Sequence, residues 1–262
     1  MPLELPGAWN VRDVAEETGT RPGRFYRSSE LSTLSEDGRR RLVELGITDV
    51  TDLRSLREVE RRGPGRVPEG VSVHLLPFPD VTAVDGEAPH EASFQKMMSE
   101  KPDDEDVAVA ARRFMTEEYQ RFPTLGGARR AVRTVITLLA DERPVITHCF
   151  AGKDRTGFTV ATVLLAAGVP RDAVIADFLR SNEAVPQLRE RILSALRERT
   201  AETPEVVTFA EARLTDEVLG VREDYLEAAW RTIDTEFGSL PRFLDAAGVA
   251  EETVRRLRKV LL

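Results

Sequence analysis

The sequence predicts one α/β domain over residues 1–262, with a mostly parallel central sheet flanked by helices. Short runs of apolar, β-branched residues alternate with longer segments in which apolar residues recur every three to four positions. No segment rich in proline, glycine or serine divides the chain, and its C-terminal third has helical periodicity almost throughout. We therefore expect a single domain with a helix-rich C-terminal part.

The first part of the chain predicts alternating strands and helices. One helix is expected to begin after Ser35, a favourable N-cap residue, and to end at Gly46. Ser55 is followed by Glu58, a capping-box pattern that predicts a short helix ended by Gly63-Pro64-Gly65. Strands are expected at three places, residues 24–27, 47–53 and 71–76.

Residues 80–106 interrupt this alternation. They hold the turn pair Asp85-Gly86 and an acidic cluster that runs from Glu100 to Asp106, so we expect a polar, mobile insertion. Amphipathic helices are expected after it, at 107–122 and 125–139, where apolar residues again recur with helical spacing.

The stretch HCFAGKDRTG, residues 148–157, carries the strongest chemical signal. A buried strand is expected before it at 145–147, and a helix after it from the apolar pattern of 160–167. A loop that closes onto a helix N-terminus directs backbone N–H groups at an anion, and the same field favours a cysteine thiolate. Arg155, six residues after Cys149, adds a planar fork suited to two phosphate oxygens. We predict a nucleophile and an oxyanion site in one loop.

Helical patterns continue beyond this loop almost to the end of the chain. A turn at Val169-Pro170 leads into a helix that contains Val174 and Leu179. The helices expected after it cover residues 185–196, 203–220, 226–237 and 254–261.

The composition excludes several classes of function. The chain carries 37 Lys and Arg against 45 Asp and Glu, and its formal net charge of −8 argues against a nucleic-acid partner. The three histidines, at 74, 90 and 148, have no metal-ligand spacing, and a single cysteine forbids an internal disulfide, so we expect no metal and no cofactor. The sequence shows no secretory signal and no apolar run long enough to cross a bilayer, which predicts a cytoplasmic protein without integral membrane association.

The loop resembles the signature of the cysteine-dependent protein tyrosine phosphatases. Cys149, five intervening residues and Arg155 match it, as do His148 and Thr156-Gly157 on either side. The whole string HCFAGKDRTG resembles the atypical branch of this family. The similarity covers nearly the whole chain, with further matching segments at 5–13, 52–55, 74–80 and 177–182.

This resemblance implies a phosphomonoester hydrolase that forms a phosphocysteine intermediate on Cys149 and needs no cofactor. The expected substrates are phosphotyrosine proteins, together with phosphoserine or phosphothreonine proteins and phosphoinositides. The resemblance also implies export by a route that needs no signal peptide, and a two-helix lid over residues 181–220. Ordinary core packing is the alternative for those helices, and the oligomeric state stays open.

The leaving oxygen needs a general acid, and the chain lacks the Trp-Pro-Asp tripeptide that supplies one in many tyrosine phosphatases. Asp154 in the loop and Asp80 after the strand at 71–76 are the candidates. Resemblance to the atypical branch favours Asp154. A helix N-cap is the structural alternative for Asp154, and a solvated start of the acidic insertion is the alternative for Asp80.

The remaining candidates are expected to bind or support the phosphate. Lys153 resembles the basic residue with which lipid phosphatases contact inositol phosphates. His148 is expected to orient the loop, and Thr156 to hydrogen-bond the regenerated thiolate or to cap the helix. Arg54 either touches substrate or pins the loop, and Glu30 and residues 10–13 are expected to belong to the same supporting shell. The predicted phosphate-binding set is Phe150, Ala151, Gly152, Lys153, Asp154 and Arg155.

A rhodanese-like sulfurtransferase and a non-catalytic phosphate-binding module are the rival predictions. The first also presents a cysteine in a helix-capping loop, but that loop is one residue shorter and lacks an arginine placed for phosphate. The second would not need both Cys149 and Asp154. A nucleotide-binding P-loop is excluded because Asp154 follows Gly152-Lys153 and no glycine stands five residues before Gly152.

Overall fold

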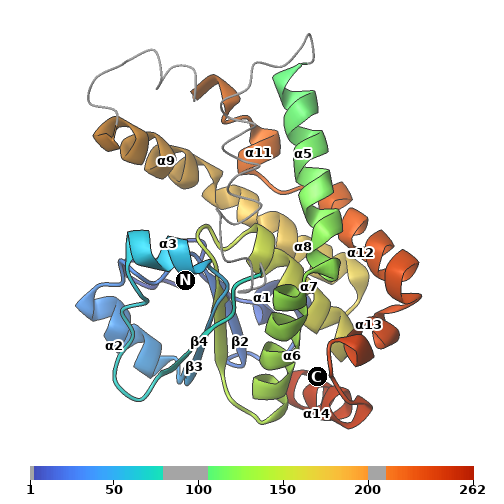
Figure 1. Cartoon of the computed structure of the whole chain (residues 1–262). Helices are drawn as coiled ribbons and strands as arrows, with labels where there is room; N and C mark the ends of the chain where they lie inside the picture. The colour runs from blue at the N-terminus through green and yellow to red at the C-terminus, as the bar shows by residue number, and fades with distance from the viewer. Residues whose placement is uncertain (1–2, 79–105, 200–210) are drawn as a thin grey trace.

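The central sheet combines parallel strands with one antiparallel edge. Within residues 3–78, 106–199 and 211–262, which the computed structural model describes, the sheet has five strands in the order β1-β2-β5-β3-β4. Only β1 runs antiparallel to its neighbour within this described sheet. The predicted, mostly parallel sheet is therefore confirmed. The strands are β1 (Arg12–Asp13), β2 (Phe25–Ser28), β3 (Asp49–Asp52), β4 (Ser72–Leu75) and β5 (Val145–His148), as Figure 1 shows.

The sheet separates a large hydrophobic core from a smaller one. Successive side chains of a strand point to opposite faces, so Phe25 and Val145 join the large core while Tyr26 and Ile146 join the small one. Helix α2 (Glu36–Glu44) covers the small core with Leu42. The large core is built from α5 (Val107–Arg121), α6 (Gly126–Ala140), α7 (Asp154–Ala167), α8 (Arg171–Leu179), α12 (Glu223–Phe237), α13 (Leu240–Ala246) and α14 (Glu251–Leu261).

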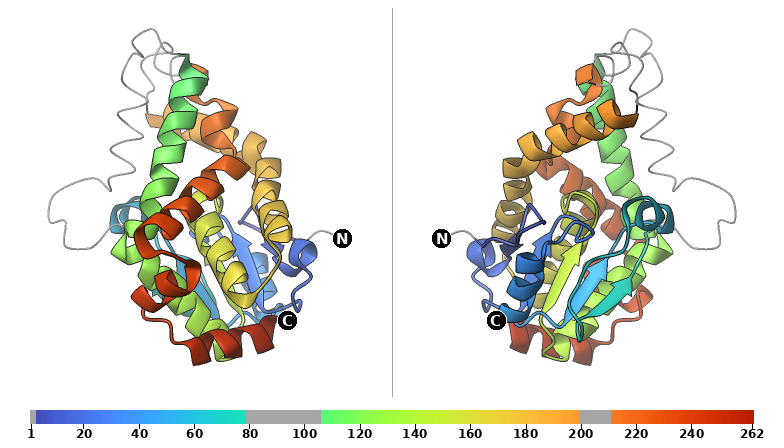
Figure 2. Two further views of the ribbon diagram at one scale, coloured as in Figure 1. Left: turned by 90° about the vertical axis from the view of Figure 1, so that its right-hand side faces the viewer. Right: turned by 90° about the vertical axis from the view of Figure 1, so that its left-hand side faces the viewer.

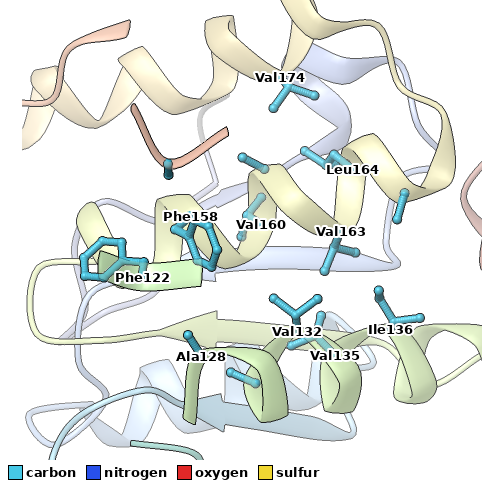
Figure 3. Packing of buried hydrophobic residues seen from close by; sticks show 14 of the residues in the cluster. Phe122, Ala128, Val132, Val135, Ile136, Phe158, Val160, Val163, Leu164 and Val174 are labelled. Carbon is cyan, nitrogen blue, oxygen red and sulfur yellow. The ribbon is translucent and has the colours of Figure 1, made fainter. Parts of the chain in front are cut away.

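Helices α6 and α7 pack against each other at the centre of the large core. Figure 3 shows Val132 and Ile136 of α6 on the side that faces Val160 and Val163 of α7, and all four side chains are fully buried. Helix α7 begins directly after the loop that holds Cys149. Its packing therefore fixes where that loop lies relative to the sheet.

The two early helices begin at their predicted caps. The Ser35 hydroxyl accepts a hydrogen bond from the Gly38 N–H at 3.1 Å. Both halves of the capping box of α3 (Leu56–Arg62) form, with the Glu58 N–H donating to Ser55 Oγ at 3.1 Å and the Ser55 N–H donating to Glu58 Oε2 at 2.7 Å. Both predicted N-termini are confirmed. Three further short elements are described, α1 (Ala15–Thr18), η1 (Phe122–Thr124) and η2 (Arg180–Ala184).

The helix predicted over 203–220 is not continuous. Residues 203–210 lie outside the described part of the chain. Residues 211–213 are helical, residues 214–215 are not, and α11 (Asp216–Leu219) follows. The prediction of one helix is wrong because Thr215 has an extended backbone, with ψ of 164°, while the buried Leu214 packs against α9 (Val185–Arg199). Tertiary packing overrides helical periodicity at this point.

Two further differences concern short segments. The acidic insertion predicted over 80–106 lies outside the described residues except for Asp106, whose carboxylate caps α5 by accepting from the Ala108 N–H at 2.8 Å. Helix α13 was not predicted; its first turn is marked by Ser239, which accepts from the Arg242 N–H at 3.4 Å. None of the helices described is both long and apolar enough to cross a membrane.

Helices α9 and α11 and the first turns of α5 rise above one end of the sheet (Figures 1 and 2). This is the carboxyl end of the parallel strands, because Lys153, which follows β5, donates to the backbone of Val218 and Gly220 at α11. Open α/β sheets bind their ligands at that end. These helices therefore cover the edge where a site is expected.

Replacing Ile136 with alanine should lower the free energy of unfolding by about 2–5 kcal/mol, because the change leaves a cavity in the large core. Urea denaturation followed by circular dichroism measures the loss. The matched change at Val43, which is 59% exposed on α2, should cost less than about 0.5 kcal/mol. Equal losses in the two variants would contradict the described core.

Candidate active site

The loop between β5 and α7 holds Cys149 at the carboxyl end of the sheet. Gly152 has a φ of +69°, and a Cβ at this position would lie 2.2 Å from the Ser28 carbonyl oxygen. Only glycine fits both the backbone conformation and this close approach. Cys149 is 3% exposed, and the N-terminus of α7 at Asp154 ends the loop. The predicted strand, loop and helix N-terminus are all present.

Arg155 is held by the carboxylate of Glu58, a residue of α3. Its Nη1 and Nη2 donate to the two oxygens of Glu58 at 2.6 and 2.8 Å, and Nη1 also lies 3.3 Å from the Leu53 carbonyl oxygen. Burial alone would lower the pKa of Arg155, but the Glu58 carboxylate outweighs it and keeps this pKa above its ordinary value. The guanidinium is therefore a charged fork of fixed orientation.

Asp154 lies between two donors at the start of α7. The Tyr119 hydroxyl donates to its Oδ1 at 3.1 Å, and the Lys153 ammonium lies 3.2 Å from Oδ2. Burial first, and then the Asp154 carboxylate, raise the pKa of Tyr119 well above its usual value, so its hydroxyl stays protonated. The Asp154 side chain is 25% exposed and remains accessible. Lys153 itself is buried and donates to Val218 O at 2.6 Å and Gly220 O at 3.1 Å.

A second ion-pair network surrounds Arg54, just after β3. Arg54 is fully buried, with Nη2 2.7 Å from Asp52 Oδ2 and Nη1 3.2 Å from Glu30 Oε2. His148 Nδ1 lies 3.1 Å from the Cys149 carbonyl oxygen and 3.7 Å from Asp52 Oδ1. Burial lowers the pKa of His148 in spite of Asp52, so its imidazole is neutral at pH 7. The Arg54 and His148 side chains are both fully buried.

The remaining loop residues differ in their surroundings. Thr156 Oγ1 is buried and finds no hydrogen-bond partner among the described residues, so its hydroxyl is available to a thiolate or a bound oxyanion. The Arg62 guanidinium lies 4.3 Å from the centre of the Phe150 ring. Ala151 belongs to an apolar cluster that joins the loop to α9 and α11, and its buried members are Trp9, Ala151, Leu188, Leu193, Leu214 and Leu219.

Comparison with known families identifies the chain. The model of the tyrosine phosphatase family matches residues 3–262. The chain belongs to the tyrosine phosphatase family. The match spans the helix-rich C-terminal part of this phosphatase as well as its loop.

Two relatives show how far the similarity extends. The phosphatase is 57% identical over 271 residues to triple specificity protein phosphatase PtpB of Mycobacterium tuberculosis, with 99% of this chain and 98% of the relative covered. It is 30% identical over 254 residues to a Cupriavidus necator protein that carries a tyrosine-protein phosphatase name, with 95% and 84% covered.

The structure adds residues to the predicted site of this phosphatase. Glu58 was predicted only as a helix cap, and Tyr119 only as part of an apolar helix face. Their partners Arg155 and Asp154 lie 97 and 35 residues away along the chain, so no local signal marks them. Asp80, the alternative general acid, lies outside the described residues.

Glu58→Gln should lower kcat for p-nitrophenyl phosphate roughly 10- to 100-fold, because the amide keeps the size of the side chain but loses the charge and the paired acceptors that orient Arg155. Steady-state kinetics measure this effect. Glu60→Gln, an exposed change two residues further along α3, is the matched control and should leave kcat within about twofold. An unchanged kcat in Glu58→Gln would show that the ion pair does not position the arginine.

Proposed function

We propose that this phosphatase hydrolyses phosphomonoesters through a phosphocysteine intermediate on Cys149. The observation that supports this most is the fixed fork of Arg155, six residues after a cysteine at the same helix N-terminus. Sγ of Cys149 attacks phosphorus, and the ester P–O bond breaks. Water then attacks phosphorus, the S–P bond breaks and the thiolate returns. Arg155 and the loop N–H groups bind the phosphoryl oxygens in both steps.

We assign the general acid to Asp154. Its carboxyl group lies at the start of α7, one residue before Arg155, and Tyr119 holds one of its oxygens. In the first step Asp154 gives its proton to the leaving oxygen, and in the second step it takes a proton from the attacking water. Asp80 stays the alternative.

The proposed substrates are phosphotyrosine, phosphoserine or phosphothreonine proteins and phosphoinositides. The relative from Mycobacterium tuberculosis carries a triple specificity name, and 57% identity over nearly both chains supports similar breadth here. For inositol phosphates we keep Lys153 as the proposed contact. Its ammonium would then exchange the carbonyl oxygens of Val218 and Gly220 for a ring phosphate.

We also propose that residues 181–220 form a cover over the loop. The support comes from their described parts, since Leu188 and Leu193 of α9 and Leu214 and Leu219 near α11 share one apolar cluster with Ala151. A cover of this kind excludes water from the thiolate and opens for bulky substrates.

Cys149→Ser should reduce hydrolysis of p-nitrophenyl phosphate at least about a thousandfold, because a hydroxyl is a far weaker nucleophile than a thiolate. Release of p-nitrophenol measures turnover, and circular dichroism checks that the variant is folded. Turnover of thiosulfate by a wild-type protein without phosphatase activity would instead favour a sulfurtransferase. Phosphate binding without any turnover would favour a binding module.

Asp154→Asn should slow hydrolysis of a phosphoserine peptide about 100-fold and that of p-nitrophenyl phosphate less than about tenfold, because only the alkoxide leaving group requires a proton. The ratio of the two kcat values, compared with wild type, is the measurement. Asp80→Asn is the comparison variant. The reverse pattern would assign the acid to Asp80, and equal rates in all three proteins would remove both candidates.

A further inference from the structure

Three successive carbonyl groups of the phosphate loop are bonded from outside the loop. The Phe150 carbonyl accepts from the Glu30 N–H at 3.0 Å. The Ala151 carbonyl accepts from Asn10 Nδ2 at 2.9 Å. The Gly152 carbonyl accepts from Arg27 Nη2 at 2.8 Å. All three donors lie in the N-terminal part of the chain, in or next to the first two strands.

The direction of these carbonyls determines the direction of the N–H groups. In a planar trans peptide the C=O of one residue and the N–H of the next point to opposite sides. With the carbonyls of residues 150–152 turned outward, the N–H groups of residues 151–153 face the interior of the loop. Such a set of N–H groups, next to the N-terminus of α7, is what a bound oxyanion requires.

Arg27 and Asn10 are themselves held by a buried cluster. Arg27 Nη1 lies 2.6 Å from Asp177 Oδ2, and Arg12 Nε lies 2.7 Å from Asp177 Oδ1. Arg12 Nη1 also donates to Asn10 Oδ1 at 2.7 Å, and the Ser181 hydroxyl lies within 3.2 Å of both guanidinium groups. One carboxylate thus orients both arginines, and through Arg12 it orients Asn10.

The cluster around Asp177 differs in its balance of charges from the Arg155–Glu58 ion pair. Arg155 is paired with Glu58, whereas Arg12 and Arg27 share the single carboxylate of Asp177. Burial lowers the pKa of Arg12 to about 10, and the neighbouring Arg27 guanidinium adds to the effect. Two buried cations for one anion leave a positive charge beside the loop, which favours a bound anion.

Asn10 also has an unusual backbone conformation. Its φ is +51°, one of two positive values at non-glycine residues in the described part of the chain, the other being Glu142 at +61°. Asparagine tolerates this region better than most residues. In this conformation the side-chain amide reaches the Ala151 carbonyl of the loop. The strained backbone of Asn10 is therefore found next to the site.

We propose that Asn10 and Arg27 are positioning residues of the phosphate loop, whose donors hold the Ala151 and Gly152 carbonyls away from the bound phosphoryl group. Neither residue touches substrate. The inference rests on the proposed phosphatase function and names the side chains that shape its oxyanion site.

Asn10→Gly tests the first residue, because glycine accepts the positive φ and removes the side-chain amide, with its donor to the Ala151 carbonyl and its acceptor for Arg12. We expect kcat for p-nitrophenyl phosphate to fall roughly tenfold to 100-fold and orthovanadate binding to weaken by a similar factor, with KM within about threefold. Glu142→Gly is the matched control, since it also places glycine at a positive-φ position, one that is exposed and remote from the loop, and its kinetics should equal wild type.

Arg27→Lys tests the second residue. Lysine keeps a positive charge near Asp177 but cannot bond both the carboxylate and the Gly152 carbonyl. We expect a folded protein, judged by its melting temperature, with the same loss of kcat and vanadate affinity. Arg24→Lys is the control: this half-buried arginine lies three residues earlier, and its Nη1 lies 3.4 Å from the Glu142 carbonyl oxygen.

Two outcomes would overturn the proposal. A lowered melting temperature with wild-type kcat and wild-type vanadate affinity would show that the residue has a structural role only. Unchanged values of all three quantities would show no role. If the wild type does not hydrolyse p-nitrophenyl phosphate, the proposed function fails first; vanadate titration of wild type and variants, read from the amide resonances of residues 151–153, then still tests the positioning.

Discussion

The orientation of the peptide groups after β5 is the constraint on which the rest of the site depends. A phosphoryl group in transfer carries negative charge, so N–H groups must face it and C=O groups must face away. Buried carbonyls need donors, and here the first two strands and the residues beside them supply those donors from behind the loop. The sheet thus does more than carry the cysteine, because its N-terminal strands shape the anion site.

Buried charges serve geometry in this site more than stability. Burying two opposite charges costs desolvation free energy, and the attraction between the charges rarely exceeds that cost by much. The bidentate pair of Arg155 and Glu58 nevertheless fixes the plane of the guanidinium, and the pair of Arg54 and Asp52 supports the end of β3 beside it. Apolar packing of α6 and α7 against the sheet supplies the stable framework in which these groups keep their positions.

Local sequence patterns predicted four of the five described strands, all but β1, together with most helices and the loop, since each signal lies within about a dozen neighbouring residues. The capping box at Ser55 is an example. Interactions between distant segments left no such signal. The break before α11 follows from the packing of Leu214 on α9, and Glu58 reaches its arginine across 97 residues. Arg27 looked like an ordinary strand residue because its partners lie more than a hundred residues away.

The proposed hydrolysis depends on phosphorus bonding transiently to the sulfur of Cys149. Rapid acid quench during turnover of a phosphotyrosine peptide, followed by mass spectrometry of the digested enzyme, tests this most directly. We expect one phosphoryl group, carried by the peptide that contains Cys149 and absent from Cys149→Ser. A phosphoryl group on His148 or any other side chain, with Cys149 unmodified during turnover, would contradict it.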